Sequence, residues 1–297
     1  TRYGVALLAV AAVPLIGNWS SASRRNDTVA RDWAVDLLNS VEPYGVIVTL
    51  GDNDTFPLWY AQYVEGVRPD VTVVIDQYLG MDWFVHQLLR APVHIYDATT
   101  GPPIYRSRRW TPPTHPVFRM TAAQSDAVPD LMELREPQIF RSGAIEGRIE
   151  PGYLQRPDVF VLRLITDALP ERPLYFTMGS PYPTRFGLQR YMVTEGWLQR
   201  MMPTPTSDST GRALDVAGSD ARWRIYHGPA AIVRRGDWID RPSLATPVDY
   251  ALLGLNLADA LDRQGNASRA LEVRNQSVAV IRGARMEALF GLPPSQR

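Results

Sequence analysis

The sequence predicts an α/β fold: a mostly parallel, Rossmann-like sheet with flanking helices, an irregular insert and a C-terminal helical hairpin. Residues 46–50 and 71–75 are continuous apolar runs rich in valine and isoleucine, which is typical of strands covered on both faces. A helical stretch separates these runs, and strand, helix, strand is the right-handed crossover unit of a parallel sheet. Two helical patterns joined by a short polar turn follow at residues 248–263 and 268–282.

The N-terminal half of the sheet is predicted from alternating helices and strands. A helix over residues 29–41 has apolar side chains at every fourth position, from Val29 to Val41, and a Glu-Pro-Tyr-Gly turn ends it before the strand at 46–50. A second helix is expected from about Phe56 to Val64. The strand at 71–75 follows. After it we expect a helix at residues 82–89 and a short strand at residues 93–96.

The C-terminal half is less regular. Pro and Arg become frequent over residues 98–157, which predicts an irregular insert beside the sheet with room for short strands. A helix at 158–169, a strand at 174–178 and a further strand at 191–202 are expected after it. The expected division of the chain is residues 1–17 as the end of a transmembrane helix, 18–202 as the α/β domain, 203–246 as a loop and linker region, and 247–297 as the helical hairpin tail.

The helical tail resembles one tetratricopeptide-type hairpin. Small and apolar residues stand at the repeat's usual positions, from Leu257 and Ala258 to Ala270, although Arg274 and Ser277 depart from the pattern. A single unit of this kind cannot bury its own apolar face. We therefore expect it to dock on the α/β domain or to continue into further repeats.

The N-terminal stretch over residues 3–17 is uncharged and apolar, but shorter than the roughly 20 residues of a membrane-spanning helix. The chain begins with Thr1, so we interpret the stretch as the end of a transmembrane helix. A secretory signal and a buried core helix remain alternatives. Arg24 and Arg25 follow directly, and the positive-inside tendency would place the next domain in the cytoplasm.

The composition excludes several classes of function. Basic and acidic residues number 31 each, so no overall field attracts nucleic acid, and no nucleic-acid partner is predicted. The absence of cysteine excludes disulfides, thiolate catalysis and Cys-ligated metals. Glycine-rich dinucleotide and phosphate loops and the Gly-x-Ser-x-Gly elbow are also absent, which disfavours dinucleotide redox chemistry, nucleotide hydrolysis and serine hydrolysis.

The most specific motif is Gly-Asp-Asn-Asp-Thr-Phe-Pro-Leu-Trp-Tyr, directly after the first strand. Ligands of parallel α/β sheets bind beyond the carboxyl ends of the strands, so this polar turn is a candidate site. The alternative is purely structural, because Asp, Asn and Thr also cap helices and Pro57 suits a first turn. The candidate binding residues here are Asp52, Asn53, Asp54, Thr55, Trp59, Tyr60 and Gln62.

The second strand adds two candidates. Asp76 and Gln77 follow it, and parallel strands would bring them close to Asp52 and Asp54 at one edge of the sheet. Such a group suits sugar hydroxyls or a divalent cation, with Asp52 and Asp54 as the metal candidates. No other cofactor is predicted, and Asp76 capping the next turn is the structural alternative.

Residues Asn18 to Leu89 resemble a family of large bacterial membrane proteins. The resemblance is carried by Asn18-Trp19, the Arg-Arg-Asn-Asp step at 24–27, Ala30-Arg31-Asp32, Leu38-Asn39-Ser40 and the motif from Gly51 to Gln62 with Val64-Glu65-Gly66. These proteins contain a long-uncharacterised domain linked to protein O-mannosyltransferases of the GT-C glycosyltransferase class.

The resemblance implies that a multi-helix membrane half, which holds the acidic catalytic residue and uses a lipid-linked sugar donor, precedes this region. The chain would then be the extracytoplasmic, periplasmic domain of a polytopic glycosyltransferase, attached to the membrane through its N-terminal helix and aiding acceptor binding or assembly. A polypeptide acceptor or a glycan is the expected partner. Two alternatives remain: a free-standing α/β enzyme that uses an Asp-x-Asp metal site and a nucleotide-sugar, and a non-catalytic protein-binding module.

Overall fold

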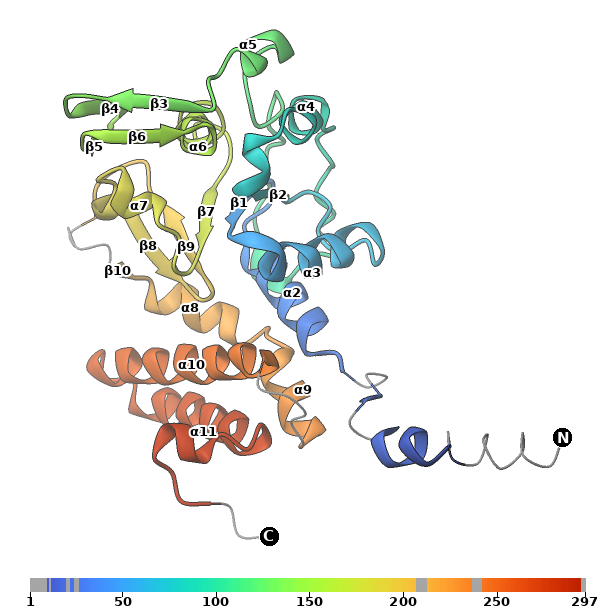
Figure 1. Cartoon of the computed structure of the whole chain (residues 1–297). Helices are drawn as coiled ribbons and strands as arrows, with labels where there is room; N and C mark the ends of the chain where they lie inside the picture. Colours follow the sequence, from blue (N-terminus) through green and yellow to red (C-terminus); the bar gives the residue numbers. More distant parts are fainter. Residues whose placement is uncertain are drawn as a thin grey trace, which may run out of the picture.

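The computed structural model describes residues 10, 12–19, 22–23, 27–206, 213–236 and 242–294. It confirms the α/β class, with a body built on a sheet and a helical region packed below it in the view of Figure 1. Residues 12–19 are helical with exposed apolar side chains, while residues 1–9 and 11 of the expected transmembrane segment lie outside the described residues. Within the described ranges, no helix has both the length and the apolar character needed to cross a bilayer.

The central sheet has six strands in the order β10-β8-β9-β7-β1-β2. The predicted parallel pairing is confirmed: β1 lies between β2 and β7 and runs parallel to both. β9 is antiparallel to β7 and β8, and β10 is parallel to β8, so the sheet is mostly rather than wholly parallel. The strands are β1 (Val46–Thr49), β2 (Thr72–Ile75), β7 (Leu174–Thr177), β8 (Met192–Glu195), β9 (Leu198–Met201) and β10 (Ala213–Leu214).

Helices cover both faces of this sheet, as the continuous apolar strands require. Ile47 belongs to one apolar core, which it shares with α2 (Val29–Ser40), α3 (Gly51–Tyr63) and the helical tail. Its neighbour Val48 belongs to a second apolar core, which it shares with α4 (Asp82–Arg90) and α6 (Arg156–Asp167). Successive side chains of a strand point to opposite faces, so one short strand supplies both cores.

The insert is more regular than expected. Two antiparallel ladders, β3 with β6 and β4 with β5, follow one another along a long hairpin at the edge of the body. Their alternation of buried and exposed residues is clear only in β5, so most of the hairpin shows little periodicity in sequence. The elements are α5 (Ala122–Asp126), β3 (Leu131–Leu134), β4 (Gln138–Ser142), β5 (Ile145–Ile149) and β6 (Gly152–Gln155).

Three predicted elements were wrong. The segment 93–96 has no strand, and the single strand expected at 191–202 is the β8–β9 hairpin, which turns at Gly196 with a φ of 61°. The region 203–246, expected to be loop, contains α8 (Val216–Trp223) and α9 (Gly228–Arg235). Both helices are short, and their apolar faces are visible only once packed against other elements. The domain boundaries themselves stay predictions.

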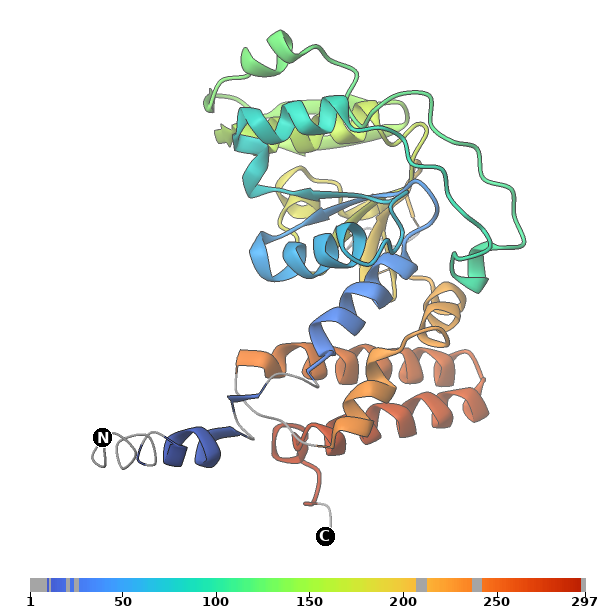
Figure 2. The same ribbon diagram turned by 90° about the vertical axis from the view of Figure 1, so that its right-hand side faces the viewer.

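The C-terminal helices α10 (Ala245–Arg263) and α11 (Ala267–Gly283) form the predicted antiparallel hairpin, which lies against α2, α8 and α9. Figure 2 shows this layer below the sheet, joined to the body through α2 and α9. The expected docking on the α/β body is therefore confirmed. The tetratricopeptide identity stays a prediction.

The fully buried Asp36 of α2 fixes this docking. Its carboxylate accepts hydrogen bonds from the backbone N–H groups of His227 and Gly228, at 2.8 Å each, and from the Tyr250 hydroxyl at 2.6 Å. The packing of α2, α9 and α10 against one another therefore depends on this one acceptor.

We expect Asp36→Ala to lower the free energy of unfolding by about 3 kcal/mol or more, since each buried donor left without a partner costs about 1–3 kcal/mol. Urea unfolding followed by circular dichroism measures the change. Asp262→Ala is the control, because Asp262 is exposed and its ion pair with Arg274 should contribute at most about 1 kcal/mol. Equal losses for the two variants would contradict the role assigned to Asp36.

Candidate functional site

A cavity of about 750 Å³ lies beyond the carboxyl ends of β1 and β7, between the α/β body and the helical tail. The body contributes α2, the first turn of α3, the end of β7 and the β8–β9 turn, and the tail contributes the start of α10. The lining side chains used below are Trp33, Asp52, Asn53, Asp54, Phe56, Thr177, Trp197 and Asp249.

The cavity forms here because strand turns into helix without a loop. Gly51 adopts a φ of 75°, a left-handed conformation that glycine reaches without steric cost, and α3 begins at this residue rather than at Phe56 as expected. The Asp-Asn-Asp sequence is therefore the first helical turn. Pro57, expected in the first turn, lies inside the helix, where it cannot donate a hydrogen bond to the Asn53 carbonyl.

The capping interpretation of the motif is only partly correct. The N-cap residue is Leu50, which has no side-chain cap, and the Leu50 N–H is instead a hydrogen-bond donor to the Asp54 carboxylate. Asp54 thus supports the helix start and also faces the cavity. Asp52 and Asn53 are exposed in the same wall.

The predicted meeting of the two strand ends is confirmed in space. Asp76 follows β2 and accepts hydrogen bonds from the Gln77 N–H at 2.7 Å, from the Tyr182 hydroxyl at 3.3 Å and from the Gly51 N–H. Gln77 is close as well, because a side chain on Gly51 would come within 3.5 Å of its amide nitrogen. Both residues lie beside the cavity at the edge of the site, and ligand binding by them stays a prediction.

The remaining candidates serve the fold. Thr55 is buried and bonds to the Gly51 carbonyl and to Thr49, and Gln62 donates both amide hydrogens to the carbonyls that precede β2, those of Arg68 and Val71. Trp59 packs on Tyr78 and Phe84, and Tyr60 is exposed outside the cavity. We leave these four residues, Thr55, Trp59, Tyr60 and Gln62, out of the site proposed below.

Burial and neighbouring carboxylates together determine the pKa values of the aspartates in the cavity. Burial raises the pKa of Asp54 above its usual value, the Leu50 N–H and Thr177 hydroxyl partly offset this, and the negative charges of Asp249 and Asp76 raise it further. Partial burial also raises the pKa of Asp249, which reaches the cavity from α10. Sequence reasoning missed Asp249, Thr177 and Trp197, because no local motif marks them.

The geometry does not favour a metal. Asp52 and Asp54 lie two positions apart on a helix, and side chains at this spacing do not face each other. Across the described ranges, no three or more His, Asp or Glu side chains lie close enough to hold a metal ion. The Asp-x-Asp pair therefore lacks the convergence that a metal and nucleotide-sugar site requires.

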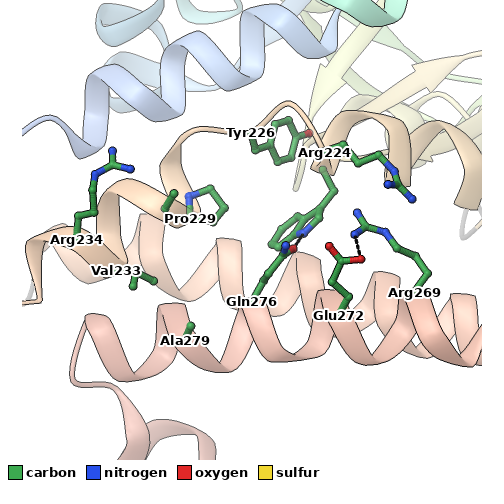
Figure 3. Close-up of a pocket in the computed structure, with 11 residues that line it drawn as sticks. Arg224, Tyr226, Pro229, Val233, Arg234, Arg269, Glu272, Gln276 and Ala279 are labelled. Carbon is green, nitrogen blue, oxygen red and sulfur yellow. Dashed lines mark hydrogen bonds and ion pairs between the residues drawn. The ribbon is translucent and has the colours of Figure 1, made fainter.

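A second cavity of about 600 Å³ lies between α8, α9 and α11 (Figure 3). Its walls are apolar at Pro229 and Val233, and several of its polar side chains bond to one another. The Trp223 indole N–H bonds to Gln276 at 2.6 Å, and Arg269 pairs with Glu272 at 2.7 Å. We therefore take the acidic cavity, where Asp52, Asp54 and Asp249 form no ion pair within the described ranges, as the candidate site.

The fold and this cavity define an α/β domain with an acidic cavity at the carboxyl ends of its parallel strands. Residues 30–141 match the family model described as TMEM260-associated domain 2. Over 79 residues the chain is 30 % identical to mouse Protein O-mannosyl-transferase TMEM260, an alignment that covers 27 % of this chain and 11 % of that relative. No solved structure matches.

These similarities support the predicted relationship to O-mannosyltransferase proteins at the level of one domain. The region that matches the family model contains Trp33 and the Asp52 to Asp54 wall of the cavity. It ends before Thr177, Trp197 and Asp249, which complete the cavity from outside the region.

The raised pKa of Asp54 predicts a pH-dependent stability. The usual pKa of an aspartate and the raised pKa of Asp54 bound an interval of pH in which the folded state binds more protons than the unfolded chain. The free energy of unfolding therefore falls as the pH rises through this interval. Asp54→Asn should remove this loss and stabilise the domain at pH 7 by less than about 1 kcal/mol, since solvent screens a half-exposed group.

Thermal unfolding between pH 4 and pH 8 tests this. The gain from Asp54→Asn should shrink as the pH is lowered, and the exposed Asp130→Asn should show no such trend. If Asp54→Asn instead destabilises the domain at pH 7, the hydrogen bond from the Leu50 N–H to the Asp54 carboxylate stabilises the fold by more than the charge of Asp54 destabilises it.

Proposed function

We propose that this chain is the extracytoplasmic domain of an O-mannosyltransferase-like membrane protein and that its acidic cavity helps to bind the acceptor polypeptide. One observation carries the proposal: the motif from Gly51, which lies in the region similar to TMEM260-associated domain 2, forms a wall of the acidic cavity. The mouse relative is named as a protein O-mannosyl-transferase, and only 11 % of its length aligns, so the activity of the whole protein is part of the proposal.

In this proposal the domain binds and the chemistry takes place elsewhere. A membrane half with a lipid-linked sugar donor supplies the catalytic acid, and the domain brings the acceptor to it. The cavity suits binding, because it is wide and open to solvent and its groups come from several elements of the fold.

Exchange of the cavity carboxylates tests the function. In the full-length protein, Asp52→Asn with Asp54→Asn should reduce glycan transfer at least tenfold, because the two charges that contact the acceptor are lost while side-chain size is kept. Transfer to a purified acceptor is measured by mass spectrometry, and the circular dichroism of the isolated chain checks its folding. Asp130→Asn is the matched control. Transfer at the wild-type rate in the folded double variant would refute the role of the cavity.

The side of the membrane can be tested separately, since the chain contains no cysteine. In a full-length protein freed of its other cysteines, Asp130→Cys lies on an exposed position and should react with a membrane-impermeant maleimide added outside intact cells. Labelling only after lysis would place the domain in the cytoplasm and contradict the proposal.

A further inference from the structure

We propose that the acidic cavity binds the cationic side chain of an arginine or lysine in a polypeptide, between Asp54 of the body and Asp249 of the tail. The inference rests on the proposed function and deepens it, because it names the feature of the acceptor that the cavity recognises. Three features of the cavity, namely its charge, an unpaired indole N–H and its aromatic walls, carry the argument.

Most of the charge of the cavity is uncompensated by the described residues. Among these residues, its ionisable lining consists of four aspartates, without an arginine or a histidine. Asp27 is paired with Arg235 at 2.6 Å, but Asp52, Asp54 and Asp249 form no ion pair within the described ranges. Three carboxylates without a counter-charge attract a cation, and a partly desolvated site strengthens that attraction.

The wall of the cavity also contains a polar group without a partner. The Trp197 indole N–H is buried and makes no hydrogen bond within the described residues, and only 7 % of this residue is exposed. The nearby Thr177 hydroxyl lies close enough to Asp54 to favour its charged form, so it already has an acceptor. A buried donor without a partner is costly, so the indole N–H favours a ligand that brings an acceptor to this wall.

These two features together select among ligand classes. A neutral sugar offers an acceptor to Trp197 but no charge to pair with the carboxylates. A metal ion compensates charge but offers no acceptor, and the described residues lack a cluster to hold it. A polypeptide segment with a basic side chain meets both needs, because its cation pairs with the carboxylates and its backbone carbonyls accept hydrogen bonds.

The aromatic walls favour the same ligand. Trp33 and Trp197 pack edge to face, with ring centroids 6.3 Å apart, and the exposed Phe56 also lines the cavity. Aromatic faces attract guanidinium and ammonium groups. The cavity volume of about 750 Å³ exceeds a single side chain and leaves room for flanking backbone.

Calorimetry of the whole chain at low salt tests the inference with two matched probes. N-acetyl-arginine methylamide should bind at least tenfold more tightly than the citrulline analogue, which has nearly the same shape and no charge. Methyl α-mannoside and manganese chloride are the competing ligands. Equal affinity for the two peptides, or tighter binding of the sugar or the metal, would overturn the inference.

Substitutions in the cavity test whether the arginine probe binds there. Asp249→Asn should weaken the arginine probe about tenfold and leave the citrulline probe unchanged, whereas Asp130→Asn should change neither. Circular dichroism of each variant confirms folding, and if Asp249→Asn does not fold, Asp54→Asn is expected to act in the same way. An unchanged affinity in both folded cavity variants would place the probe elsewhere and refute the site.

The two proposals fail in different ways. If the carboxylate variants lose glycan transfer while the arginine probe does not bind, the proposed function stands and the ligand class is wrong. If the probe binds to the cavity while transfer is unaffected, the ligand class stands and the role in transfer is wrong.

Discussion

The arrangement of the whole molecule depends on the buried carboxylate of Asp36. This side chain on α2 accepts hydrogen bonds from the start of α9 and from Tyr250 on α10, and so holds the helical tail against the α/β body. The contact requires Gly228, because a side chain there would come within 2.2 Å of the Tyr250 hydroxyl. Asp249 precedes Tyr250, so the bond that docks the tail also brings the Asp249 carboxylate toward Asp54.

The C-terminal end of α2, one turn after Asp36, is fixed by a second network. The Ser40 carbonyl accepts hydrogen bonds from the Tyr105 hydroxyl at 2.6 Å and from Arg222 of α8 at 2.9 Å. Arg222 is also paired with the buried Glu195 at the end of β8. A cation at the C-terminal end of α2 complements the helix dipole as well as the free carbonyl. Two networks thus hold the C-terminal half of the helix that carries Trp33.

The body of the fold could be predicted from sequence because its signals are local. Continuous β-branched runs identified β1 and β2, and their parallel pairing correctly placed Asp76 beside the Asp52 to Asp54 turn. The exact start of α3 could not be predicted, since Pro57 is more common in a first turn than inside a helix, and only the packed structure tolerates it there. Asp249, Thr177 and Trp197 could not be found either, because their role arises from strands and helices that come together only on folding.

The pairing of buried acids elsewhere in the protein supports the proposal that the acidic cavity binds a ligand. Asp70 is paired with Arg68 at 2.8 Å, Asp158 with Arg185 at 2.6 Å, and Glu195 with Arg222. The fold therefore has ample arginine to neutralise carboxylates where stability requires it. At the junction of body and tail, no described arginine pairs with Asp54 or Asp249, although burial raises the pKa of both carboxyl groups and so disfavours their charged forms. Destabilising charge that persists in a solvent-open cavity is typical of a binding site, where the ligand supplies the missing partner.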